Sequence, residues 1–389
     1  MKKNILPIVI VLLAFIFNAC SSDEPKDPTE NPETNECLDL VDLDSYYDKI
    51  IYLDFIDDNN GWVIGYNTDN LNKRILLNTA DSGTTWNLID DDFKMLFDGN
   101  GAHSEALQFV NTTNGVKHVE FETDSKLTIE YTTDKGTTWQ TYNNPFFTYN
   151  PVTNDTEYTT PHWVRTSASN GTETLFLGEL DSDLFVLKIN NTTMNISYSH
   201  WDVGGVISLD YDSNGALHYA ANGTIVAVID ADDASIKRST DNGTTWTTVQ
   251  ELGSTGFHSA TWPNDNIGFL VFGSDWAGGE KMYKTTNGGI TWESFVMSEQ
   301  GSGYDRKLTM ISFVNENDGI GVSAFDFFVT NDGGRVWVNQ MCYTTDGQYN
   351  AGFDEVISYP SLNNGWIAGS SYNSYTSPST QGVFHYQGE

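Results

Sequence analysis

The sequence predicts an all-β protein, a seven-bladed β-propeller built from four-stranded antiparallel blades. Two repeated phrases and the distance between their copies predict this fold. A short turn of the Asn-Gly or Asp-Gly type recurs along the chain, and an eight-residue phrase such as "TADSGTTW" follows it in most units. The units are 44 to 56 residues long, which is the length of a four-stranded propeller blade.

The glycine turn gives the number of units, which is seven. Its copies stand at Gly61, Gly115, Gly171, Gly215, Gly268, Gly319 and Gly365. In most units the strand before the turn ends in an aromatic residue, as at Phe55, or at Tyr211 in the fourth unit. A second apolar strand such as "GWVIGY" follows the turn. A third strand, the eight-residue phrase and a short fourth strand complete the unit.

The eight-residue phrase predicts a tight turn between the third and fourth strands. Its central residues are Asp81, Asp134, Asp241, Asn287 and Asp332, and a degenerate sixth copy is expected near residues 185–194. The Ser or Thr hydroxyl two residues earlier and the carboxylate can both accept hydrogen bonds from backbone N–H groups. The glycine two residues later supplies a positive φ. The closing Trp is expected to pack between blades.

This phrase resembles the Asp-box, or bacterial neuraminidase repeat, whose pattern is Ser/Thr-x-Asp-x-Gly-x-Thr-Trp. Three copies match it fully, while Asn287 and Val336 depart from it in the fourth and fifth copies. Together with "NNGWVIG", the copies make the chain similar to photosystem II stability factors, sortilin-type receptors and related bacterial propellers. Both repeated phrases occupy the same end of an antiparallel blade, and we expect the Asp-boxes to be structural turns.

Residues 1–19 have the layout of an export signal, with two Lys, an apolar run and Ala19. They resemble bacterial lipoprotein signals, in which the next residue, here Cys20, is lipidated; a plain secretory peptide is the alternative. Residues 20–36 are acidic and rich in proline, which predicts a disordered tether. Their start, "SSDE", resembles the export signal of surface lipoproteins in Bacteroidota. We therefore expect a lipid-anchored outer-membrane protein at the cell surface.

Residues 37–389 are expected to form the propeller and to close it with their own first segment. The last unit lacks a fourth strand, and "CLDLVDL" at residues 37–43 precedes the first unit in the place of one. We expect this segment to complete the seventh blade. Cys37 would then lie close to Cys342 in the neighbouring blade, and an oxidising compartment would permit a disulfide between them.

The charge of the chain restricts its partners. Lys and Arg number 19 against 53 Asp and Glu, for a net charge of −34. Such a surface disfavours nucleic acid, anionic lipid and polyanionic polysaccharide and favours neutral or cationic partners. Membrane contact is expected through the lipid anchor alone. The sequence indicates no cofactor, and we expect a monomer.

The candidate site lies on the face opposite the repeated phrases, where the loops are irregular. The candidate rim residues are Glu105, His162, His258 and Glu355 at the starts of the innermost strands, Arg306 nearby, and the aromatic residues Trp201, Trp276 and Tyr304. The aromatic residues suit stacking on sugar rings or contact with a protein. The His and Glu residues could form a metal site, an acid–base site or a solvated rim, and their spacing carries no metal signature.

Three functions follow from these features. The favoured one is a non-catalytic binding module for a neutral glycan or a protein partner. The alternatives are an assembly factor like the photosystem II stability factors and a polysaccharide-cleaving glycoside hydrolase. Sialidase activity is disfavoured because the chain has only five Arg and lacks the Arg-Ile-Pro phrase. The resemblance to xyloglucan-active enzymes implies two facing propellers, and one propeller cannot form their cleft.

Overall fold

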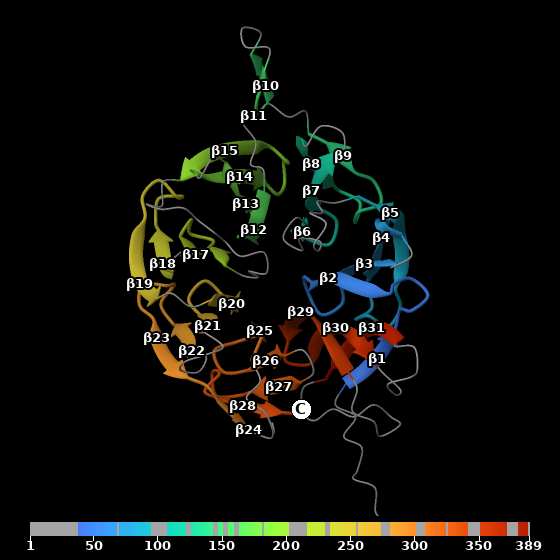
Figure 1. The fold of residues 1–389 in the computed structure, drawn as a ribbon, viewed down its shortest axis with the longest axis vertical. Helices are drawn as coiled ribbons and strands as arrows, with labels where there is room; N and C mark the ends of the chain where they lie inside the picture. The colour runs from blue at the N-terminus through green and yellow to red at the C-terminus, as the bar shows by residue number, and fades with distance from the viewer. Residues whose placement is uncertain are drawn as a thin grey trace, which may run out of the picture. The chain divides into compact units, whose positions relative to one another are not determined.

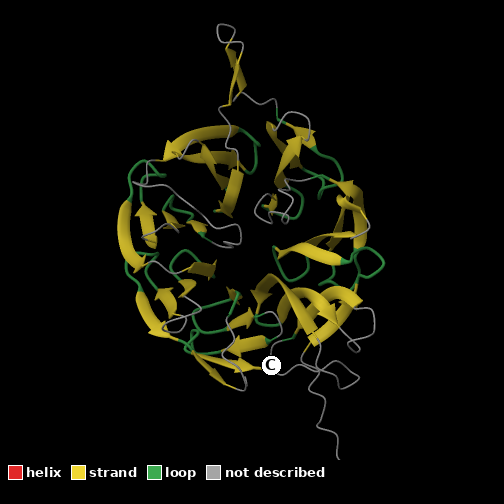
Figure 2. Ribbon diagram, in the orientation of Figure 1, coloured by secondary structure: helices red, strands yellow, loops and turns green. Residues whose placement is uncertain are grey.

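The structure is a computed structural model that describes residues 38–67, 70–94, 107–121, 126–142, 147–150, 155–158, 163–180, 183–201, 216–229, 234–253, 256–273, 281–300, 308–323, 326–340, 351–371 and 380–387. These residues form strands and turns and no helix, as Figure 2 shows. Their strands make seven antiparallel blades around a common centre (Figure 1), so the predicted seven-bladed β-propeller is confirmed.

The first four blades follow one another along the chain. Blade 1 contains β2 (Lys49–Phe55), β3 (Gly61–Asn67), β4 (Asn70–Thr79) and β5 (Asn87–Phe93). Blade 2 contains β6 (Leu107–Phe109), β7 (Gly115–Phe121), β8 (Lys126–Thr132) and β9 (Gln140–Thr141). Blade 3 contains β12 (Trp163–Ser169), β13 (Glu173–Leu180), β14 (Asp183–Asn190) and β15 (Ile196–Trp201). Blade 4 contains β16 (Leu217–Tyr219), β17 (Ile225–Ile229), β18 (Ala234–Ser239) and β19 (Thr247–Gly253).

The last three blades complete the ring. Blade 5 contains β20 (Gly256–Thr261), β21 (Gly268–Gly273), β22 (Lys281–Thr285) and β23 (Glu293–Val296). Blade 6 contains β25 (Met310–Phe313), β26 (Gly319–Val322), β27 (Phe327–Thr330) and β28 (Val336–Asn339). Blade 7 contains β29 (Ala351–Ser361), β30 (Asn364–Ser371), β31 (Thr380–Tyr386) and the N-terminal strand β1 (Leu38–Asp42).

Strand β1 closes the ring, as the sequence predicts. It pairs antiparallel with β31, from Leu38 opposite Tyr386 to Asp42 opposite Gly382. The last blade therefore takes its outer strand from the beginning of the propeller. The predicted disulfide has no support, because Cys37 and Cys342 both lie outside the described residues.

Blade 4 differs from the sequence prediction in the place of its first turn. Tyr219 at the end of β16 pairs with Ile225 at the start of β17, so the turn runs over residues 220–224. It contains Gly223, whose φ is 83°. The first turn of the blade is thus not at Gly215 as predicted, and Tyr211 and Gly215 themselves lie outside the described residues. Two Asn-Gly pairs stand eight residues apart in this unit, and the three-residue strand between them is too short for a pattern to choose between them.

Two additions to the blades were not predicted. Strands β10 (Phe147–Asn150) and β11 (Asp155–Tyr158) form a separate two-stranded hairpin between blades 2 and 3. Strand β24 (Ser298–Gln300) pairs parallel with β28 and extends the outer edge of blade 6. The loops between blades therefore carry structure that the repeats do not determine.

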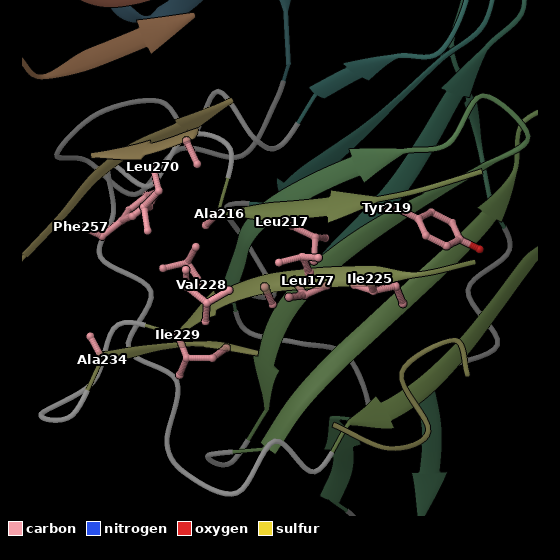
Figure 3. Packing of buried hydrophobic residues seen from close by; sticks show 14 of the residues in the cluster. Leu177, Ala216, Leu217, Tyr219, Ile225, Val228, Ile229, Ala234, Phe257 and Leu270 are labelled. Atoms are coloured by element: carbon pink, nitrogen blue, oxygen red, sulfur yellow. The ribbon is translucent and has the colours of Figure 1, made fainter. Parts of the chain in front are cut away.

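The core lies mainly between blades. Second strands such as β17, with the sequence IVAVI, are buried along their whole length, which is why they read as continuous apolar runs. Outer strands such as β19 are mostly exposed and polar. Figure 3 shows one core cluster, in which Val228 of blade 4 packs with Leu177 of blade 3 and Leu270 of blade 5. Blade 4 thus buries its second strand against both neighbouring blades.

Stacked aromatic rings join several neighbouring blades. Each pair consists of the residue after a glycine turn and the aromatic residue that ends the first strand of the next blade. The pairs are Trp366 with Phe55 (4.6 Å between centroids), Trp62 with Phe109 (3.9 Å) and Phe269 with Phe313 (3.7 Å). Trp86, which closes the first eight-residue phrase, meets Phe55 edge-on at 5.9 Å and so packs at the boundary of blades 7 and 1.

Candidate functional site

The turns formed by the eight-residue phrase, called the repeat turns below, are closed networks of hydrogen bonds. In blade 1 the Thr79 hydroxyl accepts the backbone N–H of Gly83 at 2.9 Å and donates to Asp81 at 2.8 Å. Asp81 also accepts the backbone N–H of Thr85 at 2.9 Å and its hydroxyl at 2.6 Å. These bonds hold the pKa of Asp81 below its usual value. Both carboxylate oxygens are therefore engaged within the turn.

The same network recurs in the other copies with small changes. Asp134 and Asp241 make bonds equivalent to those of Asp81. Asn287 accepts the backbone N–H of Thr291 at 3.0 Å and donates its amide N–H to the same residue's hydroxyl at 2.8 Å. An amide thus substitutes for the carboxylate without loss of the turn.

The degenerate copy in blade 3 is also a turn, as predicted near residues 185–194. Asn190 accepts the backbone N–H groups of Thr192 and Thr193 at 3.1 and 2.8 Å. Met194 takes the positive φ, 57°, that glycine has in the other copies, and its side chain is buried. The chain therefore turns here as in the other copies, although its sequence no longer matches the eight-residue phrase.

The repeat turns of blades 1, 2 and 5 also contact the preceding blade. The Trp62 Nε1–H of blade 1 donates to the carbonyl of Lys135 in the blade 2 turn at 3.1 Å. The Arg238 Nε–H of blade 4 donates to the carbonyl of Gly288 in the blade 5 turn at 2.9 Å. Gly83 has a φ of 69°, and a Cβ at this position would overlap the Trp366 ring of blade 7. The turns are therefore part of the joints between blades.

The structure describes little of the predicted rim cluster. Glu105, His162, Trp276, Tyr304 and Arg306 lie outside the described residues, and the side chains of Trp201 in β15 and Glu355 in β29 are not described. His258 lies in β20 with its imidazole half-buried. The predicted convergence of these eight residues therefore stays a prediction.

The backbone gives one further fact about these positions. The pairing of β20 with β21 shifts register at His258, and the pairing of β29 with β30 is irregular over a stretch that includes Glu355. Register shifts also occur at Ile51 in β2 and Arg165 in β12. Such bulges re-aim side chains and recur beside functional sites.

A cavity of about 250 Å³ lies among the first strands of six blades. Figure 1 shows these strands, β2, β6, β12, β20, β25 and β29, around the centre of the ring. The polar residues that line the cavity are Tyr52, Asp54, Gln108, Thr166, Ser167, Ser259, Thr261 and Ser312. The cavity is thus a central channel lined mainly by hydroxyl and amide groups.

Several hydroxyls near the channel satisfy backbone N–H groups of the next blade. Ser259 accepts from Ile311 at 3.2 Å, and Ser358 accepts from Phe55 at 3.1 Å. The free edge of an inner strand needs such acceptors because an unpaired buried N–H group is costly. The Ser167 hydroxyl instead donates to the Gln108 carboxamide oxygen at 3.2 Å, joining blades 2 and 3.

Asp54 carries the single carboxyl group among the described residues of the channel lining. Burial raises its pKa to about 6, and hydrogen bonds from Tyr52 and from the backbone of Phe55 offset only part of that rise. The Tyr52 hydroxyl lies 3.5 Å from the carboxylate. Asp54 was not selected in the sequence analysis. Its position directly before the aromatic residue that ends an inner strand could have indicated a place in the channel.

A second, open cavity of about 600 Å³ lies beside the turns of blades 5 and 6. Its lining includes Asp265, which accepts the Ala221 backbone N–H at 3.0 Å and lies 3.6 Å from His218 Nε2. Burial lowers the pKa of His218 to about 4 despite this carboxylate. Asp265 is thus engaged with blade 4. Within the described ranges no three metal-binding side chains gather, and no helix could span a membrane.

Comparisons with known proteins agree with the fold. No family model matches the sequence, and no curated protein matches it. Among solved structures, "YCF48 bound to D1 peptide" superposes with a TM-score of 0.55 at 17% identity, covering 91% of this chain and 97% of that one. These similarities show a shared fold. At this identity they show nothing of activity.

Two further structures share the propeller. The GH74 xyloglucanase from Xanthomonas campestris gives a TM-score of 0.53 at 11% identity, covering 86% of this chain and 54% of the enzyme. The chain therefore spans about half the length of that enzyme. U3-55K gives a TM-score of 0.51 at 9% identity, covering 87% of this chain and 95% of that one. Proteins with very different names thus share this fold, which is compatible with binding or scaffold roles.

Proposed function

We propose that the protein is a non-catalytic binding module for a neutral glycan or a protein partner, displayed at the cell surface by a lipid on Cys20. The observation that carries the proposal is the central channel. It has a volume of about 250 Å³ and is lined by the first strands of six blades, five of which contribute polar side chains to the described lining. Sites of this kind fix a polar ligand through a few convergent hydrogen bonds on a rigid scaffold.

The repeat turns support the same assignment indirectly. Their carboxylates are engaged in hydrogen bonds within each turn, and their carbonyls receive donors from the neighbouring blade. The opposite face, which carries the irregular loops, is then the surface available for a ligand. The net charge of −34 disfavours anionic partners there.

Two structural neighbours illustrate both partner classes. The name of one, YCF48 bound to D1 peptide, describes a peptide complex, and the name of the other describes a xyloglucanase. For this chain, a protein segment and a neutral glycan are therefore both reasonable ligands on a propeller of this kind. The assignment to either remains our proposal.

A ligand screen tests the proposed function. The full-length protein, purified in detergent, is applied to an array of neutral glycans and to a peptide library, and reducing ends are assayed in parallel. Binding without new reducing ends supports the proposal. New reducing ends overturn it in favour of a glycoside hydrolase, and absence of any ligand favours an assembly role.

The membrane anchor has its own test. Cells are fed a radiolabelled fatty acid, and the protein is compared with a Cys20→Ala variant. We expect label on the wild-type protein only, and loss of the wild-type protein from intact cells treated with an external protease. An unlabelled wild-type protein would contradict the anchor.

A further inference from the structure

The channel holds a carboxylate that faces no cationic side chain of the described lining. The fifteen lining residues that the structure describes include Asp54 and no Lys, Arg or His. At neutral pH most of this carboxyl is ionised, since its pKa is about 6. A charge surrounded by protein is costly to maintain unless a counter-charge or several hydrogen bonds compensate it. The Tyr52 hydroxyl at 3.5 Å and the backbone N–H of Phe55 compensate only part of that cost.

Other groups of the described lining are hydrogen-bond acceptors as well as donors. Gln108 presents a carboxamide oxygen that already accepts one bond from Ser167 and retains a second lone pair. Ser312, which is partly exposed, lines the same cavity, and its hydroxyl can accept further bonds. One carboxylate with several neutral acceptors suits a small ligand group that carries one positive charge and several N–H donors.

We propose that the central channel binds a primary ammonium group of its ligand, with Asp54 as the counter-ion and Gln108 among the neutral acceptors. This inference rests on the proposed function, because it names the chemistry of the ligand at the same channel. Two sources carry such a group, namely a lysine side chain of a protein partner and the free amine of one amino sugar within an otherwise neutral glycan.

The size and charge of the site favour this group over other cations. An ammonium is compact and its three donors point in three directions, whereas a guanidinium is planar and needs paired acceptors. A cavity of about 250 Å³ admits the end of one side chain or one sugar ring. The strongly acidic chain, with its net charge of −34, raises the local concentration of any cationic ligand.

Matched small probes test the inference on the full-length protein in detergent. The amine probes are methyl β-glucosaminide and Nα-acetyl-lysine amide. Their neutral counterparts are methyl N-acetyl-β-glucosaminide and Nα-acetyl-norleucine amide. Titration is followed by NMR at pH 7.5. We expect at least one amine to bind about tenfold or more tightly than its neutral counterpart, and the better amine identifies the source.

Two isosteric variants locate the binding. Asp54→Asn should abolish the preference for the amine, whereas Asp58→Asn, which removes the same charge from an exposed turn of blade 1, should preserve it. Thermal unfolding shows whether each variant is folded, and Asp54→Ser replaces Asp54→Asn if that variant does not fold. A preference that survives in a folded Asp54 variant overturns the inference.

The remaining outcomes separate this inference from the proposed function. If neutral probes bind as well as the amines, or if no probe binds while the glycan or peptide screen yields a ligand, the inference fails and the proposed function stands. If neither the probes nor the screen yields binding, both fail and the channel holds only water.

Discussion

The indole ring of Trp62 in blade 1 lies parallel to the Phe109 ring in blade 2, with 3.9 Å between centroids. The same indole donates its Nε1–H to the carbonyl of Lys135 in the repeat turn of blade 2. One side chain therefore supplies both an apolar contact and a hydrogen bond across the joint. This pairing explains why the glycine-turn phrase and the eight-residue phrase recur together.

Trp62 should be a strong determinant of stability. Trp62→Ala removes the stack and the hydrogen bond, and should lower the free energy of unfolding by about 3–5 kcal/mol. Trp62→Phe keeps an aromatic ring but leaves the Lys135 carbonyl without this donor, for a loss of about 1–3 kcal/mol. Urea unfolding measures both losses. Equal stability of Trp62→Phe and the wild-type protein would show that the hydrogen bond contributes nothing.

Asp81 should tolerate an amide and not an apolar side chain. Asp81→Asn should retain most of the stability, because Asn287 makes equivalent bonds in blade 5. Asp81→Ala removes the acceptor of the Thr85 N–H and hydroxyl and should lower the melting temperature clearly. Calorimetry compares the three proteins. Equal melting temperatures for the Asn and Ala variants would contradict this role.

The glycines of two turns should differ in how far they tolerate alanine. Gly83 and Gly171 both have positive φ values, 69° and 82°, but only at Gly83 would a Cβ overlap a neighbour, the Trp366 ring. Gly171→Ala should cost about 1 kcal/mol for the backbone alone. Gly83→Ala should cost about 2–4 kcal/mol because overpacking is added. If urea unfolding gave similar losses of stability for the two variants, the Trp366 ring would be able to move aside at little cost.

Asp54 should make stability fall as pH rises. Its folded-state pKa, about 6, lies above the usual 3.8, so the folded state holds the proton more tightly. The stability this proton supplies is complete below about pH 4 and lost as pH rises through about 6. Tyr52, the other titratable group of the described lining, stays neutral over this range because burial raises its pKa well above the usual value.

The comparison of Asp54→Asn with the wild-type protein isolates that effect. The variant should gain about 1–3 kcal/mol relative to the wild-type protein between pH 4 and pH 8. Urea unfolding at several pH values gives the difference. A difference that stays constant across this range would mean that Asp54 has an ordinary pKa.

The repeats made the blades and the closure predictable, because each copy brings its own turn chemistry and glycine. The blade 4 turn was not predictable, since Gly215 and Gly223 offer the same local signal. The channel was even harder to predict from the sequence. Asp54, Gln108 and Ser312 come from blades 1, 2 and 6, and only the closed ring brings all three to one cavity. Their shared position, directly before a terminal Phe, was the available signal.

The central claim is that the repeat turns are scaffold and that the ligand binds in the central channel and at the face opposite those turns. Isothermal titration of a ligand from the screen tests it with two sets of variants. The triple variant Trp201→Ala, Trp276→Ala, Tyr304→Ala should fold and lose most of its affinity. The double variant Asp81→Ala, Asp134→Ala should unfold at lower temperature and, while folded, keep nearly full affinity. Full affinity in the triple variant, with none in a folded double variant, would contradict the account.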